Sequence, residues 1–149
     1  MPTKEDVHIA CIAEIKNRII AFHKILIDLK EGAQNDAKSS AGDKHETSRA
    51  MMQIEQEKIG KQLKEAEEIK NVLEKIDARI PHIKVALGSL INTNAGIFYI
   101  AAALSKIKLS HQDIFVLSPQ SPLGAKLLGL NLNDKIELNS KQFTINAIS

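Results

Sequence analysis

The sequence predicts an α+β fold: an N-terminal antiparallel α-helical coiled-coil hairpin over residues 1–80, followed by a small antiparallel β domain with one short helix over residues 81–149. Two observations carry this prediction. Apolar residues recur at heptad spacing in the first half of the chain and alternate with polar ones in short runs after Pro81. A polar segment, residues 32–48, divides the heptad region into two stretches and contains no large apolar side chain.

The first helix of the hairpin is predicted from a spacing of three and four residues between apolar side chains. These are Ile12, Ile15, Ile19, Phe22, Leu26 and Leu29. The second helix has a seven-residue repeat, with two more apolar residues at the other core position: Met52, Ile59, Ala66, Leu73 and Ile80, with Ile69 and Ile76. Glu55 and Gln62 occupy that second position nearer the loop, so we expect looser packing there. Pro81 is expected to end this arm.

Two such helices bury their apolar sides by folding back on each other. The midpoint of the arms falls near Gly42–Asp43, which predicts a polar tip near residue 43. An arm of about 36 residues is about 54 Å long, so we expect the hairpin to project. An intermolecular coiled coil would show the same heptads, but two stretches of similar length around one polar segment favour the intramolecular hairpin.

Strand signals begin after Pro81. The predicted strands are 83–87 and 96–100, with a turn at Asn92-Thr93-Asn94, then 113–117, and a closing hairpin of 134–138 and 142–148 through Asn139-Ser140-Lys141. A short helix over 121–129 is predicted from Ser121 as N-cap, Pro122 at the first helical position and Gly129 at the C-cap.

Composition narrows the classes of function. The net charge is +2, with 14 Lys and Arg against 15 Asp and Glu in residues 1–80, and 6 against 3 in residues 81–149. Neither half has the concentrated basic face of an autonomous DNA-binding protein. The absence of Trp and the single Tyr argue against a base-stacking platform. With one cysteine, Cys11, and no apolar run long enough to span a membrane, we expect a cytoplasmic protein. We also expect a monomer, as the intramolecular hairpin suggests.

Two stretches of the sequence are similar to one protein family. Residues 117–129, Leu-Ser-Pro-Gln-Ser-Pro-Leu-Gly-Ala-Lys-Leu-Leu-Gly, with Asn133-Asp134-Lys135-Ile136-Glu137-Leu138, resemble the C-terminal signature of the Gre-type transcript cleavage factors. Asn133 stands where that family usually has Gly, and Gln120 where it often has Asp. Gly42-Asp43-Lys44-His45-Glu46-Thr47 resembles the Gly-Asp-x-x-Glu-Asn of the family's hairpin tip, at the place where heptad counting sets the tip.

The resemblance covers about residues 5–149 and implies a transcription elongation factor of bacterial RNA polymerase. It implies that the β domain has an FKBP-like fold and docks at the secondary channel of the polymerase through Gln120, Ser121 and Pro122. The hairpin would bring Asp43 and Glu46 to the active site, where the polymerase hydrolyses the nascent RNA at its 3′ end in backtracked complexes. The chain would then be an accessory factor and not itself an enzyme.

Asp43 and Glu46 are the candidate catalytic residues. Three positions apart at a helix start, they lie on one face and could hold a Mg²⁺ ion shared with the polymerase active site, while the isolated protein binds none. The same Asp-x-x-Glu pattern is also typical of helix capping. Lys38, Lys44 and Arg49 are candidates for RNA contact, or form an ordinary solvated face.

Two other functions compete with transcript cleavage. A non-cleaving secondary-channel regulator would share the fold and the docking site, and Lys44 and His45 make this tip less acidic than is typical. A prolyl isomerase or chaperone is suggested by the FKBP-like fold alone. Residues 81–149 offer few aromatic residues for an isomerase pocket: Phe98, Tyr99, Phe115 and Phe143.

Overall fold

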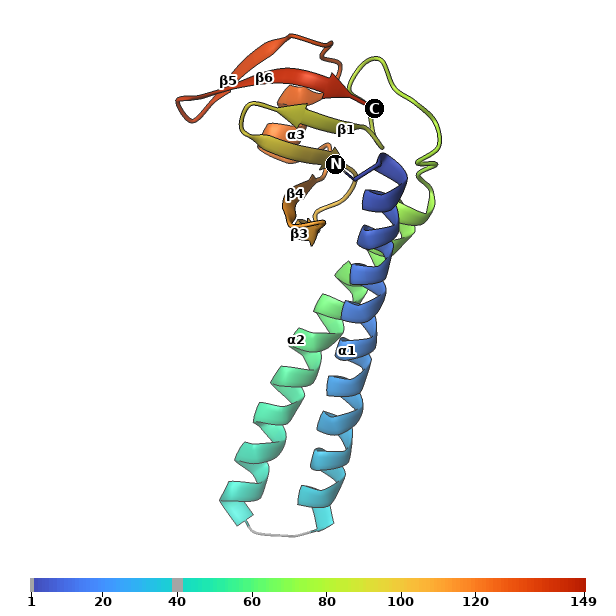
Figure 1. Cartoon of the computed structure of the whole chain (residues 1–149). Coiled ribbons are helices and arrows are strands. Elements are labelled where there is room, and N and C mark those ends of the chain that lie inside the picture. Colours follow the sequence, from blue (N-terminus) through green and yellow to red (C-terminus); the bar gives the residue numbers. More distant parts are fainter. Residues whose placement is uncertain (1, 39–41) are drawn as a thin grey trace. The chain divides into compact units, whose positions relative to one another are not determined.

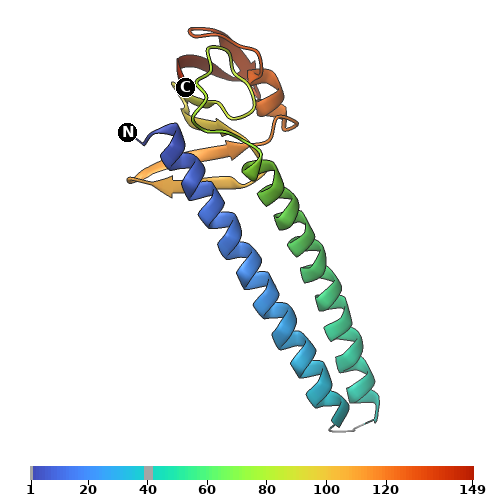
Figure 2. The ribbon, with the colours of Figure 1, turned by 90° about the vertical axis from the view of Figure 1, so that its right-hand side faces the viewer.

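A computed structural model describes residues 2–38 and 42–149, and the side chains of these residues apart from 33–38 and 42–45. Helix α1 spans Lys4–Lys38 and helix α2 spans Gly42–Glu74, so only residues 39–41 lie between them. Over Ile15–Glu68, which contacts define as one compact unit, the two helices run antiparallel side by side (Figure 1, Figure 2). The predicted helical hairpin is therefore confirmed.

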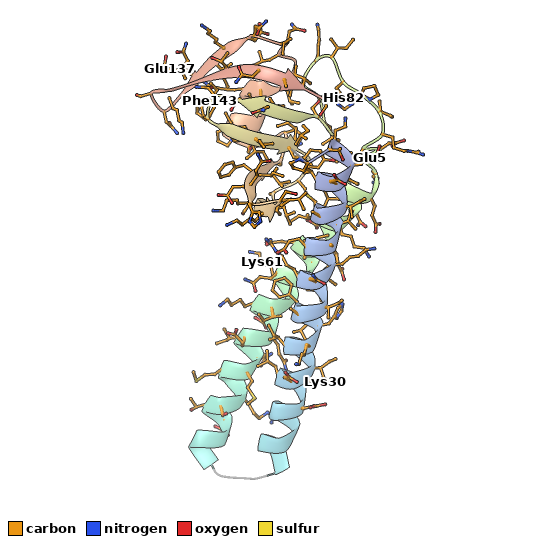
Figure 3. The ribbon with its side chains drawn as sticks, viewed as in Figure 1. Glu5, Lys30, Lys61, His82, Glu137 and Phe143 are labelled. Carbon is orange, nitrogen blue, oxygen red and sulfur yellow. The ribbon has the colours of Figure 1, made fainter. Side chains whose placement is uncertain are left out.

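Burial follows the predicted heptads. On α2, Ile59, Ala66 and Leu73 are buried, whereas Lys61 is exposed, like Lys30 on α1 (Figure 3). The other predicted core positions are half-buried, apart from buried Ile15 and exposed Ile80: Ile12, Ile19, Phe22, Leu26, Leu29, Met52, Ile69 and Ile76.

Packing loosens toward the end of the hairpin where α1 stops and α2 begins. Met51 and Ile54 are largely exposed there, as is Ile27 on α1. The helices still approach closely at Gly32, where an added Cβ would meet the Met52 side chain at 3.4 Å. Glu55 and Gln62, the two polar residues at the second core position of the heptad, are half-buried. This agrees with the looser packing expected there.

The second arm is shorter than predicted. Helix α2 ends at Glu74, where the Lys75 and Ile76 amides donate to the carbonyls of Val72 and Leu73 in tight three-residue turns. The chain then bends so that Ile76 lies against Gly88, whose added Cβ would meet it at 3.0 Å. The prediction that the helix reaches Pro81 with Ile80 in its core is wrong, because tertiary contact of Ile76 ends the helix earlier and leaves Ile80 exposed.

Six strands and one short helix follow. The strands are β1 Leu90–Thr93, β2 Gly96–Ile100, β3 Ser105–Leu109, β4 Gln112–Leu117, β5 Lys135–Leu138 and β6 Lys141–Ile148, and the helix is α3 Pro122–Leu127. They form one sheet in the order β3-β4-β2-β1-β6-β5 (Figure 1). All neighbours pair antiparallel except β2 and β4, which are parallel, so the sheet is mixed where an antiparallel one was expected.

Two predicted elements are wrong. Residues 83–87 form no strand, because the Val85 main chain bonds instead to Gly129 and Leu130. The first strand is β1, which includes Asn92 and Thr93 of the predicted turn, and the turn lies at Asn94-Ala95. Strand β3 was not predicted at all. The predicted strands 96–100 and 113–117 and the closing hairpin 134–148 are confirmed to within a residue or two.

The sheet has two faces, which register and contacts distinguish. Face A carries Ile97 and Tyr99 of β2 with their partners Ile114 and Val116 of β4. The first turns of α1 cover it, since His8 bonds to Tyr99. Face B carries the alternate residues, and α3 covers part of it. The core there joins Ile91, Ile100 and Ile145 of the sheet to Leu127 of α3, with Val85.

Contacts therefore group Met1–Glu14 with Ile69–Ser149 as a second compact unit. The division into domains at 1–80 and 81–149 stays a prediction, since contacts alone do not test which part folds independently.

No helix among the described residues is both long and apolar enough to cross a membrane.

Candidate functional site

The predicted docking residues, Gln120, Ser121 and Pro122, lie at the capped start of helix α3. Ser121 is the N-cap of α3, with its Oγ accepting a hydrogen bond from the Gly124 amide at 3.1 Å. The same hydroxyl donates to the Ser118 carbonyl oxygen at 2.7 Å. Both functions of the Ser121 hydroxyl are thus used inside the loop, as the capping interpretation predicts. Pro122 occupies the first turn of the helix, where its missing amide hydrogen costs nothing.

Gly124 is the residue of this loop that sequence reasoning missed. An added Cβ would lie 2.1 Å from the Ser118 carbonyl oxygen and 2.7 Å from Ser121 Oγ, so only glycine allows the loop to close on the helix. The signal that could have identified it is the glycine three residues after the N-cap, in the sequence Ser121-Pro122-Leu123-Gly124. Gln120 and Pro122 are exposed and available to a partner, whereas Ser121 is half-buried and holds them in place.

The acidic motif falls at the end of the hairpin where α1 stops and α2 begins. Helix α2 begins at Gly42, so Asp43 and Glu46 both belong to its first turns. Glu46 and Arg49 are exposed. The side chains of Asp43, Lys38 and Lys44 lie outside the described residues, although their backbone belongs to α2 and α1. The motif is thus on the helix pair where the chain reverses direction, and its two acidic positions share a turn of helix.

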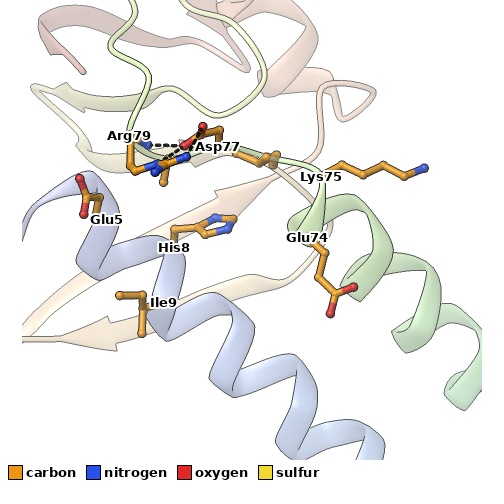
Figure 4. Close-up of a pocket in the computed structure, with 9 residues that line it drawn as sticks. Glu5, His8, Ile9, Glu74, Lys75, Asp77 and Arg79 are labelled. Carbon is orange, nitrogen blue, oxygen red and sulfur yellow. Dashed lines mark hydrogen bonds and ion pairs between the residues drawn. The ribbon is translucent and has the colours of Figure 1, made fainter.

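A cavity of about 440 Å³ lies between the start of α1 and the segment that follows α2 (Figure 4). Its lining carries charges of both signs, including Glu5 and Glu74. Arg79 donates to the Asp77 carboxylate through its Nε and an amino group, both at 3.0 Å, and through its backbone amide. These bonds lower the pKa of Asp77 to about 2. Asp77 and Arg79 therefore satisfy each other, which makes them a structural pair.

His8 at the edge of this cavity ties α1 to the sheet. Its Nδ1 lies 2.7 Å from the Tyr99 hydroxyl, and the two rings meet edge to face. Burial lowers the pKa of His8, against the opposing effect of Asp77, and burial raises the pKa of Tyr99. We therefore assign the Tyr99 hydroxyl as donor to a neutral imidazole. Sequence reasoning gave His8 no role, since its partner is 91 positions away.

Two more buried groups lie near this contact. Burial, reinforced by Glu14, raises the pKa of the Cys11 thiol to about 12, so the thiol is protonated and unreactive at neutral pH. Lys4 is also buried, and its Nζ donates to the Ile80 carbonyl oxygen at 2.6 Å. Both side chains hold the start of α1 in place and offer no reactive group to solvent.

No protein-family model matches this chain, and no curated protein matches its sequence. Among solved structures, the chain is similar to that of the transcription factor Gfh1, with 16% sequence identity, coverage of 93% of both chains and a TM-score of 0.38.

Proposed function

We propose that this chain is a transcription elongation factor that binds bacterial RNA polymerase through its secondary channel and stimulates cleavage of nascent RNA in backtracked complexes. The globular part docks through the exposed residues Gln120 and Pro122, which Ser121 holds in place. The hairpin presents Asp43 and Glu46 to the polymerase active site. The chain is an accessory factor, and the hydrolysis is the polymerase's own.

One observation carries the proposal. The acidic motif begins at the first residue of α2, directly after the chain reverses direction, and it is joined to two helices of 35 and 33 residues. Helices of that length extend about 50 Å. A carboxylate pair on such a support can reach into a narrow channel, which a pair on a compact domain cannot do. The Gre-like motif at residues 42–47 therefore stands on a fold suited to that use.

The roles of the two carboxylates follow from the chemistry of phosphodiester hydrolysis. Two divalent ions about 3.5–4 Å apart supply the Lewis acidity for in-line attack of water on phosphorus. Asp43 is proposed to hold the second Mg²⁺ at the polymerase active site, because Mg²⁺ prefers carboxylate oxygens. Glu46, one turn along α2 and exposed, is proposed to orient the attacking water or to share the ion. Lys38, Lys44 and Arg49 are proposed to contact RNA phosphates beside them.

A stalled, backtracked polymerase complex tests the proposal. Asp43→Asn should bind polymerase as well as wild type does, stimulate RNA shortening from the 3′ end at least about 10-fold less, and recover partly at raised Mg²⁺. Glu46→Gln should behave similarly but more mildly. Glu57→Gln, an exposed carboxamide substitution further along α2, is the matched control and should cleave normally. Gln120→Arg should weaken polymerase binding instead. Full cleavage by Asp43→Asn would contradict the proposed role of the tip.

Lys44 and His45 favour a second candidate, a non-cleaving regulator of the secondary channel. These residues place a cation and an imidazole between the two acidic positions. In that case wild-type protein would bind polymerase and change its elongation rate without shortening the RNA. The same assay separates the two functions, because only a cleavage factor releases fragments from the RNA 3′ end.

A further inference from the structure

Face B of the sheet has one part that α3 leaves uncovered, at strands β3 and β4. Phe115 of β4 pairs with Lys106 of β3 on one side and with Phe98 of β2 on the other, so the three side chains point the same way. Phe98 and Phe115 are stacked with ring centroids 5.5 Å apart. Phe98 is buried, whereas Phe115 keeps 36% of its surface exposed. One aromatic ring is therefore partly open to solvent and rests on a buried one.

The ring of Phe115 is held in position from below as well. It lies over Gly96, where an added Cβ would be 3.5 Å from its Cε2 atom. Phe98 in turn meets Phe143 of β6 edge to face, with ring centroids 6.0 Å apart. A side chain that is stacked on one buried ring and lies over a glycine loses little conformational freedom when a ligand stacks on it, so binding costs less entropy.

Three lysines lie on the same face of the sheet as this ring, two of them on the neighbouring strand β3 and one on β6. Lys106 and Lys108 are two positions apart on β3 and so point to one side, with their backbones roughly 7 Å apart. Lys141 of β6 holds its Nζ 5.7 Å from the centroid of Phe143. The one carboxylate facing them from β4 is Asp113. It lies directly opposite Lys108 in the register and 3.7 Å from the Lys106 ammonium, so it offsets part of the charge of these two lysines, and it is on a different strand pair from Lys141.

A partly exposed ring on the same face as spaced ammonium groups matches the chemistry of single-stranded nucleic acid, in which planar bases alternate with phosphates along an extended backbone. An acidic peptide would use the lysines but would leave the flat ring without a matching planar group. The small number of aromatic residues predicted no base-stacking platform, but strand order and register place one ring, Phe115, on an open face that also carries three lysines.

We propose that the surface formed by Lys106, Lys108, Phe115 and Lys141 binds single-stranded RNA, with a base stacked on Phe115 and phosphates on the lysines. The choice of RNA over DNA rests on the proposed function, in which the chain works beside nascent RNA. The surface is separate from the acidic motif at Asp43 and Glu46, so it adds a second RNA contact to the one proposed near the tip.

Fluorescence anisotropy with the full-length chain tests this surface. The probe is a labelled single-stranded RNA of about 12 nucleotides, within the range that such surfaces cover, measured at low salt. Phe115→Leu keeps an apolar strand residue but removes the ring, and should weaken binding about 5- to 100-fold. Lys108→Gln should weaken it and reduce the slope of log K against log salt by about 0.7.

Lys135→Gln is the matched control. Lys135 pairs with Thr144, which points to the opposite face from Phe143, so this variant removes one exposed lysine from the other side of the same sheet. It should leave RNA affinity within about twofold at moderate salt. Circular dichroism of Phe115→Leu checks its fold, and Lys108→Gln, an exposed substitution, keeps the test valid if Phe115→Leu unfolds.

Three outcomes would overturn the proposal. They are no RNA binding by the wild-type chain, wild-type RNA affinity in both Phe115→Leu and Lys108→Gln, or a preference for DNA of the same sequence over RNA. Competition by polyglutamate as strong as by unlabelled RNA would also overturn it, because stacking would then contribute nothing. Asp43→Asn should still bind RNA at this surface. If the wild-type chain does not stimulate cleavage but Phe115→Leu still weakens its RNA binding, the cleavage function alone is refuted.

Discussion

At the scale of single residues, His8 shows how one side chain on a helix depends on the sheet beneath it. Its Nδ1 bonds to the Tyr99 hydroxyl, and burial lowers its pKa below the ordinary value of 6.5. The pKa of His82 is lowered in the same way, with Lys4 adding to the effect of burial. Both imidazoles therefore bind protons less readily in the folded protein than after unfolding.

This difference sets the sign of the pH dependence. Between the folded pKa of His8 and about 6.5 the unfolded chain binds more protons, so the free energy of unfolding rises with pH and is fully restored above that window. Denaturant unfolding measured from pH 5 to 7.5 should show this rise. Asp77 does not contribute in that range, since its pKa falls from 3.8 to about 2 and its stabilisation is lost only as pH drops through those values.

His8→Gln should flatten the rise, because a carboxamide oxygen can accept from Tyr99 but does not titrate. The exposed His23 on α1 offers a control, and His23→Gln should retain the wild-type profile. His82 remains in both variants, so a smaller slope should persist in His8→Gln. An unchanged slope in His8→Gln would show that its burial does not control protonation.

At the scale of elements, the heptad pattern predicts burial along α2 as far as the tertiary contact of Ile76. The heptads of α2 bury Ile59, Ala66 and Leu73, yet the helix stops at Glu74 because Ile76 turns in against Gly88. Leu73 in the last turn is fully buried. The end of α2 is thus anchored by packing of an apolar side chain and not by the proline seven residues later.

Leu73→Asp should therefore be severely destabilising. It removes a buried apolar side chain and places an unpaired carboxylate in its position, which we expect to cost more than about 3 kcal/mol in free energy of unfolding. Its neighbour Val72 is 38% exposed, and Val72→Asp should cost about 1 kcal/mol or less. Chemical denaturation of both variants measures the contrast, and comparable losses would contradict the heptad assignment.

At the scale of the whole molecule, the sheet is covered by two segments that are far apart in sequence. Face A, with Tyr99, lies beneath the first turns of α1, and face B lies in part beneath α3. Residues 81–149 contain the complete sheet but lack the helix that covers face A. The segment Met1–Glu14 therefore belongs physically with the β strands, as the contacts indicate.

A fragment of residues 81–149 tests this dependence. It should expose the apolar residues of face A, bind the dye ANS and unfold with low cooperativity, because a face this apolar is unstable in water. The full-length chain is the reference and should bind little dye. A fragment that unfolds as cooperatively as the full chain, without binding ANS, would show that the β domain is independent and that 81–149 is a true domain boundary.

The sequence alone determined the features that depend on neighbouring residues. Heptad spacing set the two helices, and the polar segment set where the chain turns back. Ser121 and Pro122 set the start of α3, and Asn139 and Ser140, both at positive φ, set the closing hairpin. Each of these follows from local propensity, capping or turn geometry, which act within a few residues.

Only the tertiary structure decided the features that depend on distant partners. Residues 83–87 have the composition of a strand, but the main chain of Val85 finds its hydrogen bonds at Gly129 and Leu130. The exposure of Phe115 on the same face as three lysines likewise follows from strand order and register. Pairing between distant segments depends on which surfaces can be buried together. The spacing of residues along the sequence does not determine this.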